Sequence, residues 1–201
     1  MNAFKNISLF VIGLGLLAIA AVGWLTYDHF RTPDPETIVS TSLEAFKEQN
    51  RLVPFTARFV SIATTSNKRL GFRSQKTLIL PGTVRYEIDL SKLERSDLSW
   101  DENNGTLSIT LPPIELGGPE FDAEAPQEYV DGEFILYVTG DEPDFDKANR
   151  QAARTDIIRQ AREDTPMRLA RAAAIKAVET SFSLPLRAVG IEAEVRAGFA
   201  E

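Results

Sequence analysis

An uninterrupted apolar run from Ile7 to Leu25 is the feature that most constrains the architecture of this chain. The run has nineteen residues and no charge, and Tyr27, Asp28 and His29 follow it closely. A helix of this length spans about 28 Å at about 1.5 Å per residue, close to the roughly 30 Å hydrocarbon core of a bilayer. The sequence therefore predicts an amino-terminal membrane anchor that tethers a second, more polar part.

A cleaved signal peptide is the alternative to a retained anchor. Ala18-Ile19-Ala20 has the small-x-small form of a cleavage site, and the apolar stretch before it has signal-peptide length. We favour the anchor because the apolar run continues to Leu25, beyond this candidate cleavage site. The preceding segment also offers only Lys5 and the amino terminus as positive charges.

The residues around the end of the apolar run are expected at the membrane interface, where aromatic side chains form a belt at the headgroups. They are Trp24, Tyr27, His29 and Phe30. His29 is the only histidine of the chain. We favour an interfacial position for it over a role as a general base or metal ligand.

Topology follows from the distribution of charge. Lys5 and the amino terminus, set against Arg31, favour an amino terminus on the inner side. From Asp28 onward the chain has 21 basic and 29 acidic residues, a formal charge of −8, which an anionic cytoplasmic leaflet would repel. We expect a single-pass protein of the bacterial inner (plasma) membrane with its soluble part in the periplasm.

The rest of the chain has the size and composition of one globular domain. We divide it into a membrane anchor over residues 1–31, a linker and short helix over residues 32–51, and a soluble domain over residues 52–201. Apolar residues at helical spacing between Glu36 and Asn50 predict the short helix.

Alternating and β-branched residues predict an antiparallel sheet after this helix. Residues 52–60 alternate as a strand, and residues 77–80 and 83–90 form a stronger one, with Pro81-Gly82 between them interpreted as a bulge, bend or turn. Residues 97–100 and 106–111 predict a hairpin, because Asn104-Gly105 supplies the positive φ of a tight turn.

Another turn signal and another expected strand follow this hairpin. Gly117-Gly118-Pro119 is expected to end a short extended piece, and residues 133–139 are expected to form another strand.

The carboxy-terminal third is predicted to contain a helix pair over about residues 144–163 and 166–188, with Pro185 at the frayed end. Gly190 is expected to stop the second helix, and alternation of apolar residues over 191–195 predicts a final short strand. The predicted fold class is α+β: a single amino-terminal transmembrane helix, then a mainly antiparallel sheet packed with the helix pair.

The order of these features resembles the family of bacterial membrane-anchored envelope proteins known as domain of unknown function 4230. The resemblance rests on the anchor, the strand phrase Pro81 to Leu93, the hairpin ending in Leu111-Pro112-Pro113, and the helix pair closing on Val189 to Val195. It covers about residues 46–196 and implies a membrane-tethered α+β domain. The family brings no established catalytic residues.

The polar residues form no catalytic constellation in the sequence. One histidine and no cysteine exclude a histidine-based triad, a multi-histidine metal site, a thiolate site and disulfides. The acidic run of Asp141, Glu142, Asp144 and Asp146 lacks the turn of a Ca²⁺-binding EF-hand and favours helix capping. We therefore expect no catalytic residue, no metal and no cofactor.

Two weaker candidate sites remain. The first is a possible partner-binding set on the helix pair, Arg150, Arg154, Arg159 and Arg162, which could serve an anionic partner. At about 100° per residue, Arg150 and Arg154 lie close together and Arg159 falls on the opposite side. The basic residues of the helix pair, which include Arg168 and Arg171, therefore do not form one face, which favours a solvated surface. The second is a possible polar site of Asp89, Ser91 and Glu133, for which a turn or side-chain cap at Asp89 is the favoured alternative.

The sequence favours an extracytoplasmic binding or structural module without catalytic activity. Its expected partners are membrane lipid, through the amino-terminal helix, and an envelope protein or another anionic partner. Nucleic acid is not expected, because the chain is acidic and its basic residues are not interleaved with aromatic ones. The alternative is a membrane-bound hydrolase or transferase that uses carboxylates such as Asp89 and Glu133.

Overall fold

The computed structural model of the chain describes residues 17, 19–24, 34–69, 71–122, 126–132, 134, 137, 138, 140 and 142–200. None of the helices in these ranges has the length and hydrophobicity of a membrane span. Most of the predicted anchor, together with Tyr27, His29 and Phe30, lies outside the described residues. Trp24 is described; it is helical, with 76% of its surface exposed.

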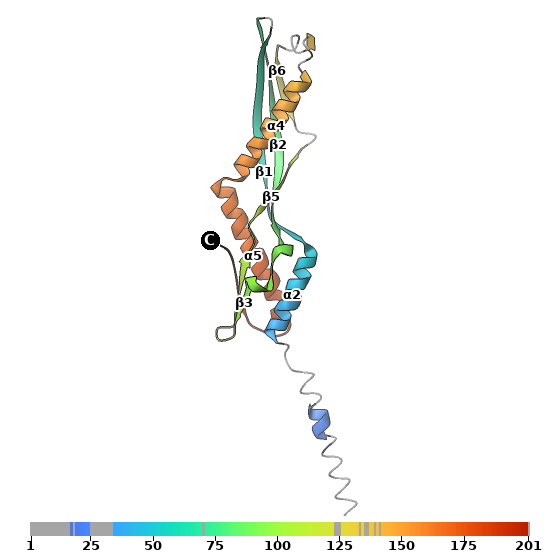
Figure 1. Ribbon diagram of the computed structural model, residues 1–201, viewed down its shortest axis with the longest axis vertical. Helices are drawn as coiled ribbons and strands as arrows, with labels where there is room; N and C mark the ends of the chain where they lie inside the picture. The colour runs from blue at the N-terminus through green and yellow to red at the C-terminus, as the bar shows by residue number, and fades with distance from the viewer. Residues whose placement is uncertain are drawn as a thin grey trace, which may run out of the picture.

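The larger sheet is built on one long hairpin. Strands β1 (Arg51–Arg69) and β2 (Phe72–Asp89) pair antiparallel over nearly their whole length, which carries them to the upper end of the molecule (Figure 1). On the other edge of β2, strand β6 (Gln127–Asp131) pairs with residues 75–79 and strand β5 (Glu115–Phe121) with residues 82–87. The sheet is therefore long and narrow.

A smaller sheet lies at the lower end of the domain. It has the order β3 (Leu98–Asp101), β4 (Thr106–Leu111) and β7 (Glu194–Phe199), with β3 antiparallel and β7 parallel to β4. The predicted hairpin is confirmed, and Gly105 has the positive φ of 59° that its turn requires. Two short 3-10 turns, η1 (Leu90–Lys92) and η2 (Arg95–Asp97), connect β2 to β3.

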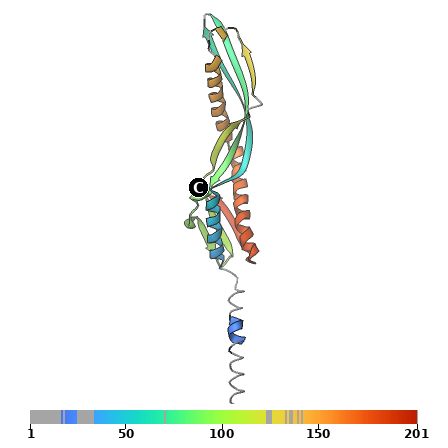
Figure 2. The same ribbon diagram turned by 90° about the vertical axis from the view of Figure 1, so that its right-hand side faces the viewer.

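Three helices complete the domain: α2 (Pro35–Gln49), α4 (Glu142–Ala161) and α5 (Asp164–Ala188). Figures 1 and 2 show α4 and α5 following the sheet end to end, with α2 beside the lower part of α5. The two long helices bury every fourth residue: Phe145, Asn149, Ala153, Ile157 and Ala161 in α4, and Ala170, Ala174, Val178, Phe182 and Leu186 in α5. Because an α-helix has 3.6 residues per turn, such a stripe winds slowly around the helix and can follow a twisted sheet.

Two main groups of apolar side chains form the core. The first, which we call the α2 cluster, joins α2, the end of α5 and the smaller sheet, and Phe46 stacks on Phe182 with ring centroids 4.7 Å apart. The second, the α4 cluster, contains Tyr86, Ile157 and Ala170, and the buried Tyr86 hydroxyl donates to the carbonyl of Ala161 at 2.9 Å. The α+β class, the mainly antiparallel sheet, the two carboxy-terminal helices and the final strand are therefore confirmed.

The prediction for Pro81-Gly82 was wrong, because this pair lies inside the central strand β2. Pro81 lacks an N–H, but it falls between Ile79, the last β2 residue that pairs with β6, and Gly82, the first that pairs with β5. A Cβ on Gly82 would lie 3.0 Å from the side chain of Ile157, so the glycine admits α4 close to the sheet.

The strand predicted over residues 133–139 is not confirmed in its described residues. Phe134, Tyr137 and Val138 are helical, and their spacing of three and four residues fits a helix as well as a short apolar strand. The strand in this region is β6, which precedes them. Gly117-Gly118-Pro119 likewise lies inside β5 rather than ending a strand, and Pro185 lies inside α5.

Candidate functional site

The junction between α4 and α5 positions the candidate site. The N–H of Arg162 donates to the carbonyls of Ile158 at 3.2 Å and Arg159 at 3.1 Å, which closes the last turn of α4. Helix α5 begins at Asp164, and Pro166 is tolerated in its first turn because N–H groups there have no intrahelical partner. The break leaves Arg162 in the connection between the two helices.

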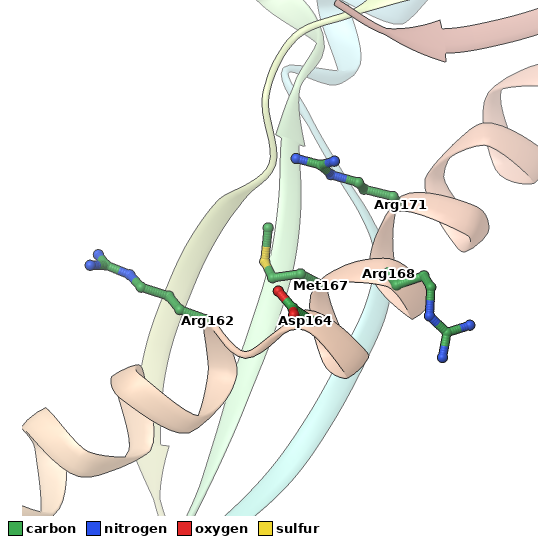
Figure 3. Close-up of a pocket in the computed structure, with 5 residues that line it drawn as sticks. All are labelled: Arg162, Asp164, Met167, Arg168 and Arg171. Atoms are coloured by element: carbon green, nitrogen blue, oxygen red, sulfur yellow. The ribbon is translucent and has the colours of Figure 1, made fainter. Parts of the chain in front are cut away.

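A cavity of about 500 Å³ opens at this junction, and we call it the basic groove. Its lining residues are Arg162, Asp164, Met167, Arg168 and Arg171. In Figure 3 the side chains of Arg162 and Arg171 point toward the strands, with Asp164 and Met167 between them, whereas Arg168 points away. The groove is therefore lined by three arginines and one aspartate, and two of the arginines share one side of it.

The three arginines of the basic groove form no ion pair with any residue that the structure describes. The guanidinium of Arg171 lies 5.6 Å from the ring centroid of Phe199 in β7, which holds it by a cation–π contact. Asp164 lies in the first turn of α5, where the helix dipole favours a carboxylate. The arginine side chains thus retain donors for an external anion.

A second cavity of about 480 Å³ adjoins the basic groove and shares Arg162 and Met167 with it. Its other lining residues are Ile114, Glu115, Leu116 and Ile158. Apart from the shared Arg162, Glu115 is its only charged residue.

Glu115 belongs to a charge network on β1, β2, β5 and η1. Its carboxylate lies 2.5 Å from Nζ of Lys92 and 3.0 Å from the guanidinium of Arg51. The hydrogen bond from Lys92 lowers the pKa of Glu115. Arg51 also pairs with Glu87, whose pKa is lowered first by the hydrogen bond from Arg85 and then by that from Arg51. The negative charge of the Glu115 carboxylate is therefore balanced by Lys92 and Arg51.

The structure separates the four arginines predicted as a partner-binding set. Arg162 lines the basic groove, but Arg159 is paired with Asp156 at 2.5 Å and with Glu163 at 3.2 Å. The guanidinium carbon of Arg154 lies 5.6 Å from the ring centroid of Phe121. Arg150 is exposed on α4 and lines neither cavity.

The helix break explains why helical periodicity does not predict the grouping of Arg162 with Arg168 and Arg171. Counting about 100° per residue relates residues within one helix only, and Arg162 is separated from Arg168 and Arg171 by the break before Asp164. Asp164-Thr165-Pro166 predicts the break, but the direction that the second helix takes after the break depends on its packing. Met167, which lines both cavities, carries no distinguishing sequence signal.

Two members of the possible polar site, Asp89 and Ser91, are described by the structure and contact each other. Asp89 accepts hydrogen bonds from the Ser91 N–H at 3.2 Å and the Ser91 hydroxyl at 2.5 Å, and so caps η1. The Ser91 hydroxyl lowers the pKa of Asp89. Glu133 lies outside the described residues.

The acidic residues at the start of α4 supply two of the partners of a buried lysine. Nζ of Lys76, whose side chain is 2% exposed, lies 2.5 Å from Asp146, 3.1 Å from Glu128 and 3.6 Å from Glu142. Burial opposes the charge of Lys76, but hydrogen bonds with Asp146 and Glu128 raise its pKa overall. No group of three or more metal-ligating side chains is found in the part of the chain that the structure describes.

The fold and the site define an elongated α+β domain with a basic groove where its two long helices meet. Residues 44–197 match the family described as Protein of unknown function (DUF4230), which is more than half of the 201-residue chain. The chain therefore belongs to this family. No curated protein and no solved structure matches it.

Proposed function

We propose that this protein is a binding module of the bacterial cell envelope that holds an anionic partner in the basic groove. The observation that carries the proposal is that three arginines, none of them in an ion pair with a described residue, line one groove of a chain with a formal charge of −7. The guanidinium group donates two parallel hydrogen bonds to a phosphate or carboxylate, which makes arginine well suited to such anions.

The surrounding structure supports this use of the groove. Arg159, which is close by in the chain, is already paired with Asp156 and Glu163, so it does not compete with the groove arginines for an anion. The amino-terminal end of α5 adds partial positive charge at the same place. A local positive field in an acidic domain would guide a small anion to this point.

The test is a thermal-shift titration of the full chain with inorganic phosphate, compared with chloride at equal ionic strength. Selective binding to the folded state raises the unfolding temperature, by roughly 3–6 °C at about ten times the Kd. We expect this rise in the unchanged protein and its loss in an Arg162→Ala, Arg171→Ala double variant.

The matched control is an Arg150→Ala, Arg187→Ala variant, which removes two exposed arginines outside the groove. It should keep the phosphate-dependent rise. An equal rise in all three proteins would mean that phosphate acts as a general salt, and the proposal would then be abandoned.

We further propose that the apolar run over residues 7–25 tethers this module to the inner membrane, with the domain in the periplasm. Support comes from the length of the run and from the acidic character of the domain. In fractionated cells, the full chain should sediment with membranes and a variant lacking residues 1–31 should not. Unchanged membrane retention of a folded truncated variant would contradict the tether.

A further inference from the structure

A cavity of about 480 Å³ lies between α2 and the end of α5, and we call it the interhelix cavity. Its volume falls within the range of small-molecule sites, roughly 300–1,000 Å³. Most of its described lining residues are apolar: Ile38, Ala45, Phe46, Pro185, Ala188 and Val189. The others are Thr41, Ser42 and Ser181, so none of the described lining residues is charged.

The α2 cluster supports the wall of the interhelix cavity. Ile38 and Phe46 pack against this cluster, and Phe46 stacks on the buried Phe182. Ala45 and Ala188 are exposed, and their small side chains leave the space beside this wall open. An apolar molecule in the cavity would therefore extend the core of the domain outward.

Ser42 gives the cavity an unpaired polar group. It is only 9% exposed, and its hydroxyl forms no hydrogen bond with a residue that the structure describes. In contrast, the hydroxyls of its neighbours Ser40 and Thr41 donate to carbonyls one turn earlier, at 2.8 Å and 3.0 Å. Among the described residues, every fully enclosed side-chain oxygen has a partner, so the Ser42 hydroxyl is open to the cavity that it lines. It is available to a bound molecule as a donor or an acceptor.

Pro185 adds an acceptor on the facing helix. A proline inside a helix has no N–H for the carbonyl four residues earlier, which here belongs to Ser181. Both residues line the interhelix cavity. The Ser181 carbonyl therefore lacks the donor that a regular helix would supply and can accept a hydrogen bond from a ligand.

From these observations we infer that the interhelix cavity binds a neutral amphiphile, an alkyl chain that carries a hydroxyl group. The chain packs on Ile38 and Phe46, and the hydroxyl accepts from Ser42 or donates to the Ser181 carbonyl. A hydroxyl suits this site because it both donates and accepts. The cavity is separate from the basic groove, so the inference does not depend on the proposed function.

The lining favours this ligand over a charged amphiphile and over a peptide. A carboxylate or an ammonium group in the cavity would lose water without meeting a counter-ion. A peptide brings an amide N–H and a carbonyl with nearly every residue, more polar groups than Ser42 and Ser181 can pair.

The experiment is photolabelling of the full chain, held in phosphatidylcholine nanodiscs, with an eight-carbon alcohol that carries a diazirine. Mass spectrometry of the digested protein locates the label. We expect saturable labelling of the peptides that contain residues 38–46 and 181–189. An excess of 1-octanol should suppress this labelling, whereas octanoate and octylammonium should require roughly tenfold higher concentrations or more.

Ala45→Phe fills the cavity from an exposed position of α2, so the core should tolerate it. Below saturation we expect roughly fivefold less label in both peptides, because the phenyl ring takes the space of the probe. Ala172→Phe, at an exposed alanine of α5 that does not line the cavity, is the control and should leave the labelling unchanged. The probe partitions equally into the lipid of all three samples, so partition does not affect the comparison.

Ser42→Ala tests the hydrogen bond. Competition by 1-octanol is compared with competition by 1-chlorooctane, which lacks the hydroxyl. Loss of one hydrogen bond should raise the half-suppressing concentration of 1-octanol by about two- to tenfold relative to that of 1-chlorooctane. Ser40→Ala, which removes a hydroxyl already bonded to the Glu36 carbonyl, should leave this ratio unchanged.

Several outcomes would overturn the inference. They are label spread evenly along α2 and α5, labelling that Ala45→Phe leaves unchanged, equal competition by octanoate, and an unchanged ratio in Ser42→Ala. A changed oligomeric state in Ala45→Phe with unchanged labelling would instead make the cavity an interface between copies of the chain. Phosphate binding in the basic groove is measured separately, so the proposed function stands or fails on its own test.

Discussion

Glu87 lies in the central strand β2 with only 9% of its side chain exposed, and its charge is stabilised by its neighbours. Arg51 and Arg85 donate hydrogen bonds to its carboxylate at 2.9 Å and 3.0 Å. On β5, a Cβ at Gly117 would overlap this carboxylate, so the absence of a side chain at Gly117 makes its position possible.

The lowered pKa of Glu87 predicts how its contribution to stability depends on pH. Because the folded-state pKa lies below the ordinary value of 4.5, this contribution is present above that pH and is lost as the pH falls through the folded-state pKa. Glu87→Gln should lower the free energy of unfolding at pH 7 by about 1–2 kcal/mol, since Arg51 and Arg85 are partly solvated.

Urea unfolding of both proteins between pH 7 and pH 3 checks this prediction. The difference between them should shrink as the pH falls below about 4.5. Glu102→Gln, at an exposed turn residue, is the control and should differ little from the unchanged protein at any pH. A difference that stays constant down to pH 3 would show that Glu87 acts through packing rather than charge.

At the scale of elements, polar contacts help to attach α4 to the hairpin. Lys76 of β2 reaches Asp146, and the side-chain amide of Asn149 donates to the Lys76 carbonyl at 2.9 Å. Farther along α4, Asp156 accepts a hydrogen bond from Ser61 at 2.8 Å, and the amide of Gln160 donates to the carbonyl of Val60 at 3.1 Å. These contacts set the position of α4 along the strands.

Lys76→Met should therefore destabilise the domain by about 1–3 kcal/mol, because neighbouring carboxylates lose their buried counter-ion. Chemical unfolding at pH 7 measures the change. Lys68→Met, at an exposed lysine of the same hairpin, should alter the free energy of unfolding by no more than about 0.5 kcal/mol. Equal effects at the two positions would refute a specific role for Lys76.

At the scale of the whole molecule, β1, β2 and α5 connect the two ends of an elongated domain. Helix α5 supplies Ala170 to the α4 cluster and Phe182 to the α2 cluster, and β2 supplies Tyr86 and Ile88 to the same two clusters. Because both clusters contain residues of α5 and β2, unfolding of one cluster would disrupt the other. We therefore expect the domain to unfold in one cooperative transition.

Ile157→Ala in a Trp24→Phe background tests this expectation. Trp100, then the only tryptophan, packs against the α2 cluster, whereas Ile157 belongs to the α4 cluster. Cavity formation at Ile157 should lower the unfolding temperature reported by Trp100 fluorescence by roughly 5–15 °C. Leu184→Ala, at an exposed position, should shift it much less; an unshifted Trp100 transition in Ile157→Ala would mean that the two ends unfold separately.

The sequence by itself determined the α+β class, the β3–β4 hairpin, the helix pair and the family. These features depend on local spacing: apolar residues recur at helical or strand periods, and turn residues such as Asn104-Gly105 act within a few positions. The anchor is predicted on the same basis, from an apolar length, and stays a prediction.

Only the tertiary structure decided how Pro81 fits into a central strand, which carboxylates surround Lys76, and which arginines share a groove. Each depends on contacts between segments that are far apart in the chain. Pro81 is accommodated where β6 and β5 leave a gap, and Arg162 meets Arg171 because α5 starts in a new direction after α4. Such contacts are set by side-chain packing and strand register, which local periodicity does not encode.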